Sequence, residues 1–273
     1  MLVTGENHPY DVVADAGHVF WTDQGSGQVV TCSANNCNAT RTVLATFGVP
    51  DDIALDATNV YWAETGGSVF ACARAGCSQS PKVLASGQAG IDGIATASGV
   101  VYWSTSTAVM SCAATGCGNA PSSFLAHSTD DLAIVGTTFF AAAYSNVYAC
   151  ALPGCTNLVT IGSAGAEGVA SDGKTIFFSS KNGDVFDCPA GGCATASTFA
   201  SSPLPGDVVT DGKNVYWVDE TLGTGRACPV AGCNGTPVTM ASGLSGPKGV
   251  AVDDTRVYFA DTYGGRIVWV AKL

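Results

Sequence analysis

Acidic side chains recur in this sequence directly before short runs of β-branched and apolar residues. The positions concerned are Tyr10-Asp11, Asp51-Asp52, Asp92-Gly93, Asp130-Asp131, Glu167-Gly168, Gly206-Asp207 and Lys248-Gly249, and six of the seven hold at least one carboxylate. Carboxylates gathered around one point repel each other, so either some of their pKa values rise or a cation lies among them. Hard oxygen ligands of this kind suit Ca²⁺ or Mg²⁺.

Two histidines could add proton-transfer chemistry. His8 and His127 lie in segments that lead into two of these positions, and a carboxylate beside a histidine can perform general acid–base catalysis. A structural interpretation stands beside this one. An aspartate at the start of a strand readily accepts hydrogen bonds from backbone N–H groups and sets a turn, and a repetitive protein would repeat it without any ligand.

The carboxylates and histidines together define the candidate site. The candidate ligand-binding residues are Asp11, Asp51, Asp52, Asp92, Asp130, Asp131, Glu167, Asp207, Lys248, His8 and His127. If a metal binds, its expected ligands are Asp11, Asp52, Asp131 and Asp207. We assign no catalytic residue and no cofactor beyond this Ca²⁺ or Mg²⁺, because no nucleophile elbow, zinc-protease motif or phosphate-binding glycine loop is found.

The composition excludes several classes of protein. The 273 residues contain 22 Asp and Glu against 11 Lys and Arg, a formal net charge of −11, and 47% of them are hydrophobic. Such a chain folds around a core, and its acidity argues against nucleic-acid binding. Because no run approaches the roughly 18 apolar residues of a membrane span, we expect no membrane insertion. The first residues lack the features of a secretion signal, so we expect the signal segment to be absent from this chain.

All 12 cysteines fall into six pairs of one spacing, C-x4-C. The pairs are Cys32 and Cys37, Cys72 and Cys77, Cys112 and Cys117, Cys150 and Cys155, Cys188 and Cys193, and Cys228 and Cys233. A four-residue hairpin loop brings its flanking positions to the separation that a disulfide needs. Zinc would require two pairs to converge, and these pairs are evenly distributed. Six local disulfides place the chain outside the cytoplasm.

The cysteine period belongs to a longer repeat of about 37 to 42 residues, which occurs seven times. The first unit contains four short segments, Asp11–Asp15, Val19–Asp23, Gln28–Cys32 and Thr42–Ala45, bounded by turn-forming residues. These are strand and hairpin signals without a helical period. Four-stranded sheets with two apolar faces are buried by radial stacking, which predicts an all-β, seven-bladed β-propeller with antiparallel blades. Trp21, Trp62, Trp103 and Trp217 should then pack between blades.

The two ends of the sequence are complementary. The seventh unit stops at Leu273 without a fourth segment or a cysteine pair, and residues 1–4 match the missing strand. The N-terminal strand should therefore complete the last blade and remove two exposed sheet edges. The predicted single domain has blades at about 10–49, 50–90, 91–129, 130–165, 166–205, 206–247 and 248–273 plus 1–9.

The units resemble known propeller repeats. Phe20-Trp-Thr-Asp23, Tyr61-Trp-Ala-Glu64, Tyr216-Trp-Val-Asp219 and Tyr258-Phe-Ala-Asp261 are similar to YWTD repeats, and Pro247–Asp253 with Ala260–Ile267 is similar to NHL repeats. YWTD propellers usually have six blades, and the cysteine hairpins belong to neither pattern. Proteins of this kind include receptor ectodomains, adhesion modules, lyases and lactonases.

The resemblance implies that the carboxylate positions surround one mouth of a central channel, the face on which such propellers commonly bind ligands. Loops after the second strand, including Asp23–Gly27, Asp219–Gly225 and Asp261–Gly265, should share this face. A second set of aspartates, in Asp-Gly or Asp-x-x-Asn contexts, is typical of turns. This set is Asp15, Asp56, Asp172, Asp211 and Asp253.

We expect a monomeric, secreted or cell-surface binding or adhesion module, and expect no enzyme. Its ligand would be a carbohydrate, a protein or a cation at the acidic mouth. A metal-assisted lyase or lactone hydrolase that uses the mouth carboxylates is the first alternative. A purely structural spacer is the second.

Overall fold

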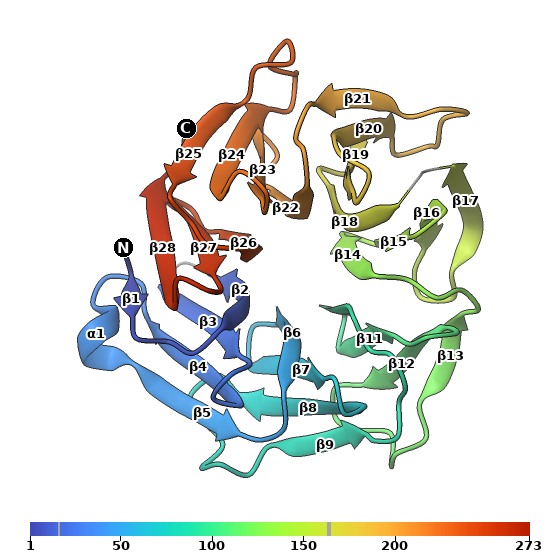
Figure 1. Ribbon diagram of the computed structural model, residues 1–273. Helices are drawn as coiled ribbons and strands as arrows, with labels where there is room; N and C mark the ends of the chain where they lie inside the picture. The colour runs from blue at the N-terminus through green and yellow to red at the C-terminus, as the bar shows by residue number, and fades with distance from the viewer. Residues whose placement is uncertain (16, 163–164) are drawn as a thin grey trace.

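The computed structural model describes residues 1–15, 17–162 and 165–273. It contains seven four-stranded antiparallel sheets, which Figure 1 shows arranged in a ring, and their first strands line a central channel. The all-β, seven-bladed propeller predicted from the sequence is confirmed. Residues 163 and 164, which the prediction assigns to the end of the fourth blade, lie outside the described residues.

Each blade runs from an inner strand at the channel to an outer strand at the rim. Blade 1 contains β2 (Pro9–Ala14), β3 (His18–Asp23), β4 (Gln28–Ser33) and β5 (Thr42–Thr46), and blade 2 contains β6 (Pro50–Leu55), β7 (Asn59–Glu64), β8 (Ser68–Ala73) and β9 (Lys82–Ala85). Blade 3 contains β10 (Ile94–Ala97), β11 (Val100–Ser104), β12 (Val109–Ala113) and β13 (Ser122–Leu125). Blade 4 contains β14 (Asp131–Val135), β15 (Thr138–Ala143), β16 (Asn146–Ala151) and β17 (Thr156–Gly162).

The remaining blades follow the same order. Blade 5 contains β18 (Ala166–Ser171), β19 (Thr175–Ser180), β20 (Val185–Pro189) and β21 (Ser197–Ala200). Blade 6 contains β22 (Pro205–Thr210), β23 (Asn214–Asp219), β24 (Thr224–Pro229) and β25 (Val238–Ser242). Blade 7 contains β26 (Pro247–Val252), β27 (Arg256–Asp261) and β28 (Arg266–Ala271), and β1 (Val3–Thr4) is its outer strand.

The hydrophobic core lies between the blades. Neighbouring residues of a second strand point to opposite sheet faces, so Phe20 packs with Trp62 of blade 2 while Trp21 packs with Tyr258 of blade 7. Seven such clusters fill the seven interfaces between blades. The predicted core tryptophans Trp21, Trp62, Trp103 and Trp217 are at most 1% exposed. The aromatic run of each second strand is therefore core and offers no stacking platform to a ligand.

The ring closes as predicted, through a short contact. Val3 pairs with Ile267 and Thr4 with Arg266 in an antiparallel register. Nearby, the buried Glu6 carboxylate accepts a hydrogen bond from the Trp21 indole at 2.9 Å and forms an ion pair with Arg41 at 2.8 Å. The N-terminal segment thus joins blade 7 to blade 1 through a strand and a buried carboxylate.

The six predicted disulfides are present, and every cysteine is paired. Their location differs from the expected hairpin flanks, because the second cysteine of each pair precedes the fourth strand and lies in the connection to it. In blade 1 this connection forms one helical turn, α1 (Cys37–Thr40), although the sequence shows no helical period. Each bridge stiffens one connection on the face opposite the channel mouth.

On this lower face, the residue after each third strand bonds to the turn between the first two strands. Its backbone N–H donates to the carbonyl that directly precedes the second strand: Ala34 to Gly17, Arg74 to Thr58, Ala114 to Gly99, Leu152 to Thr137, Ala190 to Lys174, Val230 to Lys213 and Lys272 to Thr255. The predicted turn aspartates hold the same turns. Asp211, for example, accepts the N–H groups of Lys213 and Asn214 at 2.9 and 2.7 Å.

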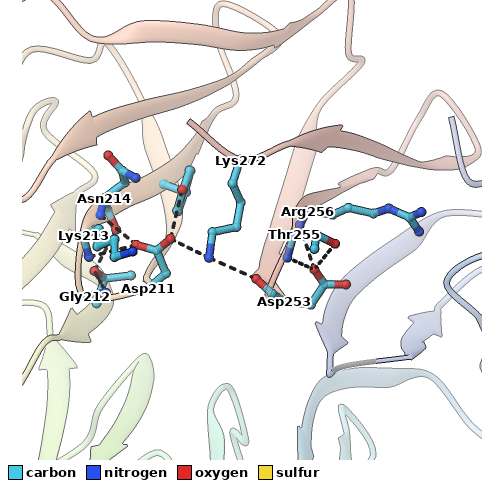
Figure 2. Close-up of polar contacts among 10 residues, drawn as sticks. Asp211, Gly212, Lys213, Asn214, Asp253, Thr255, Arg256 and Lys272 are labelled. Atoms are coloured by element: carbon cyan, nitrogen blue, oxygen red, sulfur yellow. Dashed lines mark hydrogen bonds and ion pairs between the residues drawn. The ribbon is translucent and has the colours of Figure 1, made fainter.

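Two of these residues after the third strand are basic and join neighbouring blades. The Lys272 ammonium lies 2.7 Å from Asp211 of blade 6 and donates to the Asp253 carbonyl of its own blade, as Figure 2 shows. Arg74 does the same between Asp15 of blade 1 and the Asp56 carbonyl of blade 2.

Between these two clamps, blade 7 also reaches blade 1. The Arg256 guanidinium donates to the Ala34 carbonyl and to Asn35 Oδ1. In the other five blades the residue after the third strand packs into an apolar cluster, and these residues are Ala34, Ala114, Leu152, Ala190 and Val230. The basic side chains Lys272, Arg256 and Arg74 thus join three consecutive interfaces around the closure.

Deletion of residues 1–4 should expose the edge of β28 and cause association or a large loss of stability, because an unpaired strand edge recruits other chains. Size-exclusion chromatography and thermal unfolding measure both effects, and removal of Met1 alone is the control. A monomer of unchanged melting temperature after the longer deletion would contradict closure by β1.

Replacement of Lys272 by Ala should lower the free energy of unfolding by about 1 kcal/mol at neutral pH, since the ion pair is only partly exposed. Burial opposes ionisation of Asp211, but Lys272 and two backbone N–H groups hold its pKa below the ordinary value. The contribution should therefore be present above about pH 4 and disappear as the pH falls below it. Denaturant unfolding at pH 7 and pH 3 tests this, with the exposed Lys213→Ala as control. An equal loss at both pH values would exclude the ion pair as the cause.

Candidate functional site

The candidate site is the mouth of the central channel, a cavity of about 640 Å³ lined by the first strands of all seven blades. Every carboxylate position predicted from the sequence lines it: Tyr10 and Asp11, Asp51 and Asp52, Asp92, Asp130 and Asp131, Glu167, Gly206 and Asp207, and Lys248 and Gly249. Below them the wall becomes apolar, with side chains such as Val13, Leu55 and Ile134. The channel is thus acidic at one end and apolar in its depth.

The lining residues at the mouth form two tiers. The first tier consists of Tyr10, Asp51, Asp92, Asp130, Glu167, Gly206 and Lys248. The second tier, one residue further along the chain in each blade, consists of Asp11, Asp52, Gly93, Asp131, Gly168, Asp207 and Gly249, all of which except Gly93 line the cavity.

The second-tier aspartates bridge neighbouring blades. Asp11 Oδ2 accepts the N–H of Ile53 in blade 2 at 3.0 Å, and Asp52 Oδ2 accepts that of Ile94 in blade 3 at 2.6 Å. Asp131 and Asp207 make the same bond to the next blade, each at 2.8 Å. The first three also accept the N–H of the following residue through Oδ1. The structural interpretation therefore holds for these aspartates, although they join two blades and do not set a turn within one.

Glycine occupies the remaining second-tier positions because the neighbouring blade comes too close for a side chain. A Cβ on Gly249 would lie 2.8 Å from Asp11 Oδ1, and one on Gly93 would lie 3.0 Å from the Asp131 Cα. Each interface between blades thus has either an aspartate or a glycine at its second-tier position. The result is an uneven ring of four half-buried carboxylates.

Loops after the second strands reach the mouth, as predicted, and contribute side chains that our candidate set omitted. Gln24 Nε2 donates to Asp51 Oδ1 at 2.9 Å, Lys181 lies 3.9 Å from Asp130, and Lys248 lies 2.6 Å from Glu220. Gln24, Lys181 and Glu220 each follow the second strand of their blade directly, and this position in the sequence could have identified them as residues of the mouth. The leading aspartates of the predicted loops, Asp23, Asp219 and Asp261, are instead at most 1% exposed and hold those loops in place.

The two lysines make the charge of the mouth uneven. Blades 4 to 7 form a paired arc, in which Lys181 and Lys248 face Asp130, Glu167 and Glu220. Blades 1 to 3 form an acidic crescent, which consists of Tyr10, Asp11, Asp51, Asp52 and Asp92. No ion pair to a Lys or Arg is found for these crescent residues within the described part of the chain.

Burial raises the pKa values of three crescent carboxylates, Asp11, Asp51 and Asp52, and repulsion adds to the shift of the last two. Burial, with the charges of Asp92 and Asp11, raises the pKa of Asp51 to about 7. Asp11 and Asp52 share a hydrogen bond, and burial and repulsion by Asp11 raise the pKa of Asp52 well above its ordinary value. Across the ring, burial raises the pKa of Asp131 to about 7 and that of Asp207 well above the ordinary value. The ring thus retains protons that exposed carboxylates would lose.

The two histidines lie apart from the ring. The His8 ring packs edge-on against Tyr263 with centroids 5.7 Å apart, and His127 stacks on Tyr148 at 4.3 Å. Neither residue lines the channel. Among residues 1–15, 17–162 and 165–273, no group of three or more His, Cys, Asp or Glu side chains is arranged to hold a metal ion.

The fold and the site define the chain as a β-propeller with an acidic channel mouth, and the comparisons agree on the fold. A scan of protein-family models finds no match, and a search of the curated proteins finds no relative. Among solved structures, virginiamycin B lyase of Staphylococcus aureus, as an inactive variant with quinupristin, superposes with a TM-score of 0.80 at 12% identity over 99% of this chain and 98% of that one.

Two further solved propellers are similar to the chain. The WD40 propeller domain of Doa1 gives a TM-score of 0.80 at 14% identity over 100% of this chain and 95% of its own. A chain of the nidogen/laminin complex gives 0.60 at 16% identity over 78% and 89%. Identities this low establish a shared fold only. The resemblance to YWTD and NHL repeats in particular remains a prediction.

Stability should decrease as the pH rises from 5 to 8. A carboxyl group whose pKa is raised by folding stabilises the protein fully below its unfolded value near 4, and this contribution is lost as the pH rises through the folded value near 7. Calorimetry at constant ionic strength should show a melting temperature several degrees lower at pH 8. The double variant D51N/D131N should flatten the slope, whatever its absolute stability. A slope unchanged by both substitutions would show that other groups take up the protons.

Proposed function

We propose that the protein is an extracytoplasmic binding module whose ligand docks at the channel mouth. The observation that carries this proposal is the distribution of exposed apolar and aromatic side chains. Outside the strands and the two chain-end residues, the described residues of this kind are Phe47, Val49, Tyr144, Leu222 and Tyr263, all in loops of the mouth face. Exposed apolar groups around a polar cavity are typical of a recognition surface.

The chemistry of the rest of the molecule supports this location. The lower face is occupied by turn aspartates, disulfides and ion pairs that hold the blades together. The six disulfides fit an oxidising compartment, and the described residues contain no helix long and apolar enough to cross a membrane. A rigid ring with one adaptable face suits a monomeric module that binds a protein or a glycan.

A metal-assisted lyase or lactone hydrolase has weaker support. It would use the mouth carboxylates with His8 or His127, and both histidines pack against tyrosines away from the channel. The structural likeness to virginiamycin B lyase, at 12% identity, is a likeness of fold only. Binding therefore accounts for more of the site than catalysis does.

Removal of exposed side chains from the mouth face should weaken ligand binding. We expect the variant Y263A/L222A to bind at least 10-fold more weakly to any ligand found on a glycan array or a panel of cell-surface proteins, because buried aromatic anchors dominate such contacts. The control V83S/V238S removes two exposed apolar residues, 52% and 44% exposed, from the outer strands β9 and β25.

The controls separate the possible roles of the molecule. Loss of binding in V83S/V238S and not in Y263A/L222A would place the ligand on the rim and refute the proposal. The absence of any ligand in both screens would favour a structural spacer.

A further inference from the structure

Among the described residues, the mouth has ammonium groups on one side only. In the paired arc, two carboxylates form ion pairs with lysines: Lys248 lies 2.6 Å from Glu220, and Lys181 is 3.9 Å from Asp130. In the acidic crescent, Asp51 is 9% exposed and receives only the neutral amide of Gln24. The molecule thus shows, within one ring, carboxylates that have an amine partner and carboxylates that have none.

The crescent is bordered by apolar and aromatic side chains. Val49, two residues before Asp51, is 41% exposed. On the other flank, Tyr263 is 68% exposed and packs against His8, two residues before Tyr10. A partner that covers this area would bury apolar surface around a negative centre, which is the arrangement of a hot spot with a surrounding ring.

The channel provides depth for a long side chain. Its volume of about 640 Å³ is within the usual range for a bound group, and apolar residues such as Val13 and Leu55 line the wall beneath the second tier. Lys and Arg bury their aliphatic stems against apolar surface and keep the charged end beside polar groups. A bare ion would leave both the wall and the apolar border unused.

We propose that the mouth binds a protein partner through a protruding lysine or arginine, whose charged end enters the acidic crescent while apolar residues beside it cover Val49 and Tyr263. This inference rests on the proposed function and specifies the partner. The crescent supplies charge complementarity, which favours one partner and one orientation over others. The paired arc, where Lys181 and Lys248 offset part of the negative charge, would attract a second cation less strongly.

A set of head-to-tail cyclic hexapeptides tests the proposal. Each carries one variable tip residue, lysine, arginine or norleucine, between a valine and a tyrosine, with glycine elsewhere. Calorimetric titration into the intact protein is performed at low salt and pH 8, where Asp51, with a pKa of about 7, is ionised. We expect the lysine and arginine peptides to bind at least 10-fold more tightly than the norleucine peptide, and to weaken as salt is added.

Variants of the protein locate the contact. The affinity for the lysine peptide should fall in D92N and fall further in the double variant D51N/D92N, by at least 10-fold in the latter. Asp92 is exposed, so the single variant D92N should keep the fold intact. It therefore remains informative even if the double variant D51N/D92N does not fold. The control D254N removes one equally exposed charge from the lower face and should change nothing.

The outcomes separate this inference from the proposed function. Equal binding of the lysine and norleucine peptides, or binding of neither, overturns the basic side chain as the ligand. If the norleucine peptide binds as tightly as the lysine peptide and loses this binding in the variant Y263A/L222A, the mouth remains a binding face. Only the charge argument then fails. Binding of free propylammonium as strong as that of the lysine peptide would identify a small amine as the ligand and refute the protein partner.

Discussion

Contact between neighbouring blades is the interaction on which the rest of the molecule depends. A four-stranded blade with apolar side chains on both faces cannot remain folded in water by itself, so each aromatic pair, such as Phe20 and Trp21, serves two interfaces at once. The inner end of the interface is held by aspartates that bond across it, and the lower end by clamps such as Lys272. The central channel is what remains at the axis when seven such interfaces close.

The same carboxylates serve structure and charge. Asp11 and Asp52 gain hydrogen bonds from the next blade, but their burial raises the pKa values of both, and repulsion by Asp11 raises that of Asp52 further. A cationic group in the mouth would relieve this repulsion and stabilise the ring, so stability and ligand affinity are linked in this molecule. Ionic pairing is already used in this way where Lys248 meets Glu220.

Most of the fold could be predicted because the same sequence signals recur in each blade. Hydrophobic alternation, turn aspartates and C-x4-C spacing repeat with one period, and Leu273 ends the seventh unit one strand short. The mouth could be predicted only in outline. Which aspartates cross to the next blade depends on the distance between blades, which also selects Gly93 and Gly249. The contribution of Lys181 depends on which loop leans over the channel, and the burial of Asp23 depends on the N–H of Asn7. Such tertiary contacts leave no periodic trace in a single sequence.

The short pairing between β1 and β28 has a mechanical consequence. Two residue pairs hold the outer strand of the only blade that has no disulfide, while each of the other six carries one. Tension applied between Met1 and Leu273 would be borne first by this junction. Blade 7 would then lose its outer strand first, while the apolar cluster and Arg256 still join it to blade 1.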